Sequence, residues 1–346
     1  MTDPVLSSLG WTPHFAGQVD PDEASTPARV SGVERSHIMA LGVEGPVRLL
    51  VPEGTGSIAV GDWVLQDGVH VTRRLTPATE IVRRNAGDTS RRQLIAANVD
   101  TLGIVTSCNA DFNPARLERY IAVAAQAGCL PLVILTKADQ ADDPDRYLSE
   151  ARALSPLVVA LALNAKDPEE VARLTPWVEA GRTLALVGSS GVGKTTLQNA
   201  LTGVQAATQD IRADDAKGRH TTTARALRRT LAGGCLIDTP GIRELGLVDA
   251  AEGVEEVFSD VAALAESCRF RDCTHDREPG CAVQAAIRAG TLDPERLRRY
   301  QKLEREDRLH TEALHEKHAR NRSWAKATAH GSARAKWKRR GPDAEE

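Results

Sequence analysis

One glycine-rich segment constrains this chain more than any other feature. Residues 188–195 read GSSGVGKT, which fits the pattern G-x-x-x-x-G-K-[ST] between an apolar run and a stretch that favours a helix. In such a loop the backbone N–H groups close around phosphates, Lys194 bridges β and γ oxygens, and Thr195 holds Mg²⁺. The segment predicts a nucleotide-phosphate site in an α/β domain, with Lys194 also a candidate catalytic residue. Its residues are Gly188, Ser189, Ser190, Gly191, Val192, Gly193, Lys194, Thr195 and Thr196.

Two downstream segments add contacts to a third phosphate and to Mg²⁺. The sequence DTPG at 238–241 ends a short apolar run, where Asp238 can hold Mg²⁺ through water and the Gly241 N–H can reach a γ-phosphate. Residues 218–223, GRHTTT, form a hydroxyl-rich loop that could cover the nucleotide. We assign its Mg²⁺ contact to Thr222, and the two neighbouring threonines remain open. The predicted magnesium ligands are Thr195, Thr222 and Asp238.

A guanine-reading motif, [NT]-K-x-D, is absent after Asp238 and occurs earlier, as TKAD at 136–139. The Asp139 carboxylate could accept from guanine N1–H and N2–H₂, a donor pair that adenine lacks, so the motif favours GTP over ATP. The sequence NAK at 164–166 follows the next apolar run, where a loop would back the base. The predicted base contacts are Thr136, Lys137, Asp139, Asn164, Ala165 and Lys166.

The order of these motifs is unusual. The base reader and the base-backing loop precede the phosphate loop, the threonine loop and DTPG. One GTPase fold remains compatible with this order, because joining the old termini and cutting elsewhere preserves every sheet neighbour. The sequence therefore predicts a circularly permuted GTPase domain.

The six cysteines fall into two sets. Cys108, Cys129 and Cys235 sit in apolar surroundings, which is typical of core residues. The others crowd with one histidine into 14 residues whose charged neighbours make the segment too polar for a core. Three thiolates and one imidazole form a closed tetrahedral set, which favours one structural Zn²⁺ over a catalytic one. The predicted zinc ligands are Cys268, Cys273, His275 and Cys281.

The chain carries its charge unevenly. Residues 296–341 hold 15 Lys or Arg against 5 Asp or Glu, a net of +10, whereas the whole chain carries -3. A basic tail suggests a polyanionic partner such as RNA, although a solvated helix face is the alternative. The start of the chain lacks the features of a signal peptide, and no apolar run is long enough to cross a membrane. We therefore expect a cytoplasmic monomer without membrane contact.

The local patterns predict a multi-domain protein. Short glycine-punctuated strands at 47–51, 60–64 and 69–72 suggest a small β-barrel such as an OB-fold. Strands at 101–106, 130–136, 157–163, 183–187 and 234–237 alternate with helices at 114–127, 143–154, 167–180 and 194–203, which indicates a mainly parallel α/β domain. The expected divisions are a flexible lead-in at 1–28, an RNA-binding OB-fold at 29–88, the permuted GTPase domain at 89–250, a mainly α zinc domain at 251–300 and a basic helical or disordered tail at 301–346.

On these motifs the chain resembles the bacterial ribosome small-subunit-dependent GTPase A family. The likeness covers roughly residues 29–300 and also includes VGDWV at 60–64 and IAANVD at 95–100. It implies a GTPase that assists late maturation of the 30S subunit, with an OB-fold, a permuted G domain, a zinc domain, and 16S rRNA and the subunit as partners. One departure is Asn164, where the family usually has Ser.

Hydrolysis needs a group that orients water. Ile242 stands where Ras-like enzymes carry a water-orienting Gln, and its apolar side chain cannot do this, so we expect slow turnover that accelerates on docking to the partner. His220 is the nearest candidate catalytic residue, and the family resemblance points to the same position. The histidine could instead contact RNA or have no role.

Two rival functions remain open from the sequence. The chain could be an RNA-binding module that uses GTP only as a structural ligand. It could also be a nucleotide kinase or an ATPase built on the same phosphate loop, against which Asp139 argues.

Overall fold

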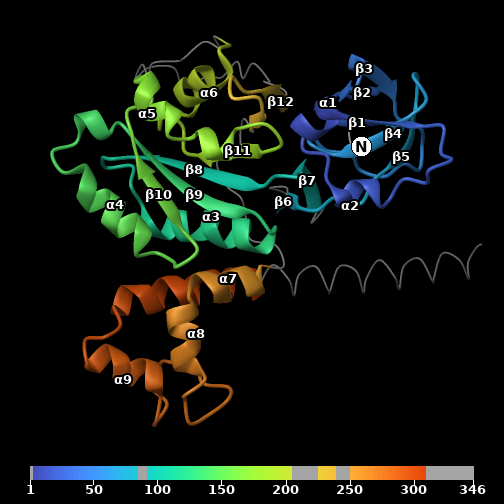
Figure 1. The fold of residues 1–346 in the computed structure, drawn as a ribbon. Coiled ribbons are helices and arrows are strands. Elements are labelled where there is room, and N and C mark those ends of the chain that lie inside the picture. Colours follow the sequence, from blue (N-terminus) through green and yellow to red (C-terminus); the bar gives the residue numbers. More distant parts are fainter. Residues whose placement is uncertain (1–2, 85–91, 205–224, 239–249, 309–346) are drawn as a thin grey trace, which may run out of the picture.

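The computed structural model describes residues 3–84, 92–204, 225–238 and 250–308. In this part of the chain a β-barrel, an α/β domain and a helical C-terminal region lie side by side (Figure 1). No helix of the described residues is both long and apolar enough to cross a membrane.

A mixed sheet forms the centre of the α/β domain. Most of its parallel strands are buried on both faces, which explains their continuous apolar sequences. In sheet order they are β10 (Val159–Ala162), β9 (Leu130–Thr136), β8 (Thr101–Ser107), β11 (Thr183–Gly188) and β13 (Cys235–Asp238), followed by the antiparallel β12 (Ala226–Arg229). The alternation of strands and helices gave the correct sheet type, but β12 was not predicted.

Helices cover both faces of this sheet (Figure 1). On one face lie α3 (Pro114–Gln126) and α4 (Pro144–Arg152), and on the other α5 (Pro168–Ala172) and α6 (Lys194–Thr202). Three of these helices have an Asn or Asp as N-cap and a Pro as the first helical residue. The N-cap side chain accepts a backbone N–H of the first turn in each case; the three N-cap residues are Asn113, Asp143 and Asp167. The predicted helix 167–180 is interrupted after α5 and continues as the 3₁₀ turn η2 (Thr175–Trp177), because Pro176 cannot extend an α-helix.

Five strands before residue 75 close into a ring. They are β1 (Thr26–Val33), β2 (His37–Gly42), β3 (Gly45–Leu50), β4 (Trp63–Gln66) and β5 (Val71–Arg74). β1 pairs with β2 and β4, β2 with β3, and β4 with β5, and a parallel bridge from Leu50 to His70 completes the ring. The pair Gly32–Ala226 joins β1 to β12, so the barrel continues the central sheet.

The structure differs from the expected loose lead-in. Residues before β1 form α1 (Pro4–Ser8) and α2 (Pro13–Ala16), and the side chains of Leu6, Leu9 and Phe15 are buried in the main core. The fully buried Arg29 guanidinium donates to the carbonyl of Leu9 and, at 2.7 Å, to that of Asn98. The burial of these apolar side chains and the hydrogen bonds of Arg29 hold in place a segment whose composition suggested mobility.

One expected domain border separates two paired strands, and another falls inside a helical stretch. β6 (Glu80–Arg84) and β7 (Arg92–Ala97) pair as antiparallel strands, so the border at 88 divides one strand pair. The border at 300 lies within a helical stretch at 294–308. Borders placed by composition missed both elements because the pairing and packing partners decide where each one ends.

The C-terminal region docks on α3. It contains α7 (Ala251–Val257), α8 (Ser259–Ala265), α9 (Ala282–Arg288) and the stretch 294–308. Glu118 of α3 is fully buried and accepts from Arg296 Nη1 at 2.8 Å and from Arg299 Nε at 2.9 Å. Asp307 accepts the Ala250 N–H at 2.8 Å, just before α7. Residues 294–308 therefore link α3 to the start of α7.

Candidate nucleotide site and metal centre

The predicted phosphate loop connects β11 to α6. Gly188 has φ 141°, and a Cβ there would lie 2.1 Å from the Val105 carbonyl oxygen, so only glycine fits between β11 and β8. Gly193 is the left-handed N-cap of α6, so the first turn of that helix faces the loop. The Lys194 ammonium donates to the Gly188 carbonyl at 2.7 Å and also to that of Ser189. The loop thus has the backbone shape that close approach to phosphate oxygens requires.

Thr136 ties the predicted base reader to this loop. Its buried hydroxyl donates to the Val192 carbonyl at 2.6 Å and lies 3.0 Å from that of Thr106. Thr136 ends β9 and Val192 belongs to the phosphate loop, so two motifs separated by more than fifty residues in sequence are hydrogen-bonded to each other.

The base reader and the base-backing loop also contact each other. Lys137 adopts φ 57°, which is rare for a residue other than glycine. The chain then enters the 3₁₀ turn η1 (Ala138–Gln140), in which Asp139 is exposed. The Ala138 N–H donates to the Leu163 carbonyl at 3.4 Å, and Leu163 N–H donates to Leu135 at 2.9 Å. The segments that carry Asp139 and the loop 164–166 therefore lie next to each other where β9 and β10 end.

Asp238 ends β13, beside the phosphate loop. Its register partner on β11 is Leu186, two residues before Gly188. Burial raises the pKa of the Asp238 carboxyl, while a hydrogen bond from Gln198 and the positive charges of Arg228 and Lys194 act in the opposite direction. The sequence analysis named neither Gln198 nor Arg228. Gln198 follows Lys194 by one helical turn, a spacing that could have found it, whereas Arg228 lies on the unpredicted β12.

All these segments share one edge of the sheet. Thr136, Ala162, Gly188 and Asp238 end parallel strands, whose carboxyl ends meet at that edge, the usual place for ligands in open α/β sheets. Three predicted site residues, His220, Thr222 and Gly241, lie outside the described residues.

A second candidate site lies in the C-terminal region. The ligand atoms of Cys268, Cys273, His275 and Cys281 all lie within 4.8 Å of one another. The Nδ1 of His275 is 3.6 Å from the sulfurs of both Cys268 and Cys281, and these sulfurs are 3.9 Å apart. His275 adopts φ 60°, and Gln284 of α9 donates to its carbonyl at 2.7 Å. The four side chains could hold a metal ion.

Comparison with known proteins decides the family. A family model described as RsgA GTPase matches residues 75–248. A small ribosomal subunit biogenesis GTPase RsgA from Mesorhizobium japonicum is 50% identical over 319 residues, which cover 90% of this chain and 92% of that protein. The chain belongs to the RsgA GTPase family.

Further relatives agree with this membership. A protein of Vibrio parahaemolyticus named small ribosomal subunit biogenesis GTPase RsgA 2 is 46% identical over 331 residues, which cover 94% of this chain and 92% of its own. Membership in the RsgA family makes the chain a GTPase, a hydrolase that acts on GTP.

Solved structures establish the fold. YjeQ from Thermotoga maritima matches with a TM-score of 0.61 at 22% identity, covering 81% of this chain and 97% of that one. YloQ, described as a circularly permuted GTPase, matches with a TM-score of 0.59 at 22% identity, covering 82% and 95%. The circularly permuted GTPase fold predicted from the motif order is confirmed.

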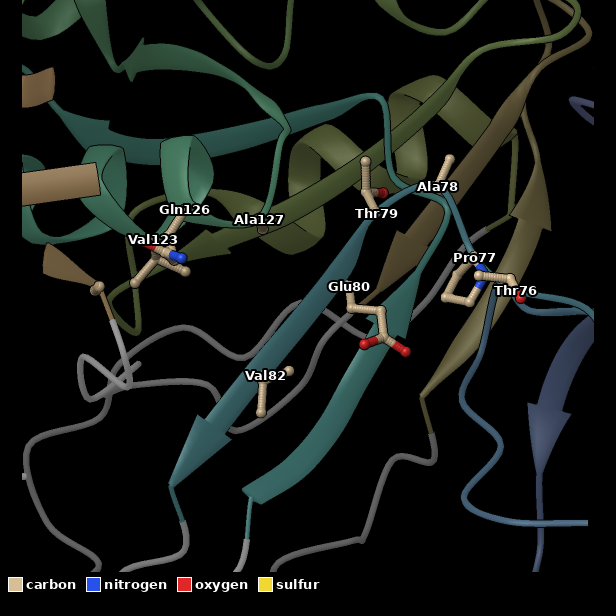
Figure 2. A pocket seen from close by; sticks show the side chains of 10 residues that line it. Thr76, Pro77, Ala78, Thr79, Glu80, Val82, Val123, Gln126 and Ala127 are labelled. Atoms are coloured by element: carbon tan, nitrogen blue, oxygen red, sulfur yellow. The ribbon is translucent and has the colours of Figure 1, made fainter. Parts of the chain in front are cut away.

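Two cavities in this RsgA-family chain lie near the C-terminal region. One of ≈ 360 Å³ opens between the start of β6, the end of α3 and Ala250, with Glu80, Val82 and Gln126 among its walls, and no predicted nucleotide residue lines it (Figure 2). The other, of ≈ 320 Å³, lies between Ser189, α3 and residues 299–303. The second cavity places the helical stretch 294–308 beside the phosphate loop.

Proposed function

We propose that this chain acts in late maturation of the 30S ribosomal subunit, where it binds 16S rRNA and hydrolyses GTP to GDP and phosphate faster when docked. The observation that carries the nucleotide part is the hydrogen-bonded arrangement of base reader, base-backing loop and phosphate loop at one sheet edge. The ribosomal part rests on the names of the relatives.

The nucleotide would lie along that edge. The loop 188–196 would surround the phosphates and Asp139 would accept from the guanine N1–H and N2–H₂. Thr195, Thr222 and Asp238 would hold Mg²⁺, which neutralises charge that develops on the phosphoryl oxygens. The positive charge of Lys194 would stabilise the same oxygens. His220 would orient the attacking water, because the apolar side chain of Ile242 cannot.

The remaining parts would serve RNA and the subunit. The strand order β1-β2-β3-β5-β4, closed by β1 with β4, supports an OB-fold, a barrel that binds oligonucleotides. The basic tail would contact phosphates, which predicts salt-dependent binding. We propose a monomer in the cytoplasm whose GTP-bound loops fit the subunit and whose hydrolysis weakens that fit.

The cysteine cluster would hold one structural Zn²⁺. A Zn–S distance of about 2.3 Å separates two sulfurs of a tetrahedron by about 3.8 Å, which the Cys268 and Cys281 sulfurs, 3.9 Å apart, match. The donor set leaves no open position for water, which supports a structural role.

Comparing GTP turnover with and without isolated 30S subunits tests the proposed function. We expect 30S subunits to raise turnover severalfold, with 50S subunits and ATP as controls that leave it unchanged. Equal turnover with either subunit would refute the ribosomal role. A lack of multiple turnover under all conditions would favour an RNA-binding module that holds GTP as a structural ligand.

Changing the base reader tests the GTP assignment separately. Asp139→Asn replaces an acceptor oxygen with an amide donor, so guanine N1–H and N2–H₂ lose a partner while the 2-oxo group of xanthine gains one. We expect the Kd of GDP to rise at least tenfold and that of xanthosine diphosphate to fall, measured by competition with a fluorescent nucleotide. Unchanged affinity for both would show that the base binds elsewhere.

A further inference from the structure

The carboxylate of Glu278 holds the backbone of the loop that carries His275. One of its oxygens accepts the Thr274 N–H at 2.9 Å and also the Thr274 hydroxyl. The other oxygen accepts the N–H groups of Asp276 at 3.0 Å and of Arg277 at 3.1 Å. The amides of the residues on both sides of His275 are therefore bound to one side chain.

His275 has a backbone conformation that histidine seldom adopts. Its φ of 60° lies in the left-handed region, where the Cβ comes close to the following carbonyl oxygen. Such a conformation persists only where the surrounding structure holds it. Here Glu278 holds the neighbouring amides, and the side-chain amide of Gln284 donates to the His275 carbonyl at 2.7 Å.

The buried imidazole of His275 lies beside two cysteine sulfurs. Its Nδ1 is 3.6 Å from the Sγ of Cys268 and 3.6 Å from that of Cys281. A tetrahedral zinc ion, with Zn–N of about 2.0–2.1 Å and Zn–S of about 2.3 Å, separates nitrogen and sulfur by about 3.5 Å. The ring therefore lies where one ion would bind all three atoms.

The main chain of Glu278 also reaches a second predicted ligand. Its carbonyl accepts the N–H of Cys281 at 3.3 Å, and Cys281 is the N-cap of α9. The same helix carries Gln284, the residue that holds the His275 carbonyl. The carboxylate and the carbonyl of Glu278 thus connect the loop of His275 to the helix that begins at Cys281.

We propose that Glu278 is a positioning residue of the metal centre: its carboxylate holds His275 in the left-handed conformation that presents Nδ1 to the ion. The proposal rests on the proposed zinc site. Glu278 is not one of the four clustered ligands, and both of its carboxylate oxygens accept from the loop, so its effect on the metal acts through His275.

Three variants of the full-length protein test this role. Glu278→Ala removes all four acceptor contacts, and Glu278→Gln keeps one acceptor oxygen. Asp276→Ala is the matched control, because it removes a negative charge from the same loop. The Asp276 carboxylate is 77% exposed and lies 3.9 Å from Arg277, and the substitution keeps the N–H that donates to Glu278.

Two measurements separate positioning from general stabilisation. Competition with a chromogenic chelator gives the Kd of Zn²⁺ for each protein. The visible absorption of the Co²⁺-substituted protein reports which side chains bind the ion.

We expect Glu278→Ala to raise the Kd of Zn²⁺ about 10- to 100-fold, the usual loss when a group that orients a metal ligand is removed. The Co²⁺ bands should change, because His275 no longer faces the ion. Glu278→Gln should lie between this variant and wild type, and it tests the role even if the alanine variant does not fold. Asp276→Ala should keep the wild-type Kd and spectrum.

Other outcomes would overturn the proposal. An unchanged Kd in Glu278→Ala would remove the role of Glu278 and leave the zinc site intact. A higher Kd with the wild-type Co²⁺ spectrum would show that Glu278 only stabilises the loop. Equal losses in Glu278→Ala and Asp276→Ala would show that the negative charge matters rather than the hydrogen bonds. A wild-type protein that binds no zinc would refute the zinc site itself.

Discussion

Replacing Lys194 with alanine is expected to lower kcat for GTP by about 10²- to 10³-fold, the loss found when one preorganised donor to a transition-state oxygen is removed. The Lys194 ammonium lies at the start of α6 and donates to the carbonyls of Gly188 and Ser189, so it is already held over the phosphate loop. Its charge would neutralise phosphoryl oxygens as the leaving group departs. Single-turnover hydrolysis of radiolabelled GTP, with and without 30S subunits, measures the effect.

A control measurement must show that the Lys194→Ala variant is folded as well as the wild type. The thermal unfolding midpoint without nucleotide should remain near the wild-type value, because Lys194 makes its described contacts within the loop. A variant that folds normally and hydrolyses GTP within about threefold of wild type would contradict the role assigned to Lys194, since each tenfold in rate corresponds to about 1.4 kcal/mol.

Removing zinc is expected to unfold the segment that contains the four ligands. Structural zinc sites in small peptides contribute about 10 kcal/mol or more to folding, and residues 268–281 have little other core. We expect one zinc per chain by elemental analysis. After chelation, hydrogen exchange should accelerate in α8 and α9, while β9 and β11 of the GTPase domain keep their protection.

Two cysteine variants sharpen this test. Cys273→Ala should lose the zinc and reproduce the exchange pattern of the chelated protein. Cys108→Ala changes a buried thiol outside the cluster and should retain one zinc per chain. A full zinc content in Cys273→Ala, or unchanged exchange after chelation, would exclude the predicted ligand set.

The sequence was sufficient to predict which segments make up the candidate site, because each motif depends on local chemistry, and the fold brings those segments together. The glycines of 188–195 permit the positive φ angles that the phosphate loop adopts, and a carboxylate two residues after Lys137 suits the guanine edge. The motif order was sufficient to predict the permuted fold that the structural relatives share. The cysteine spacing likewise predicted a cluster that the fold brings within ligand distance.

Contacts between distant parts of the chain were beyond the sequence. Arg296 pairs with Glu118 across 178 residues, and Arg29 reaches the carbonyls of Leu9 and Asn98; neither arginine differs in its local pattern from an exposed one. Composition therefore suggested a loose lead-in at residues 1–28. The structure instead has two short helices there, α1 and α2, which pack against the main core.

The sequence by itself determined which chemical groups are present and the order in which they occur. Only the tertiary structure decided how the donors of the loop 164–167 are paired, because that depends on whether Glu170 reaches Asn164 or Asp167. A hydrogen bond is settled by distances of a few tenths of an ångström, and those distances follow from the packing of β9, β10 and α5 rather than from the identity of any one residue.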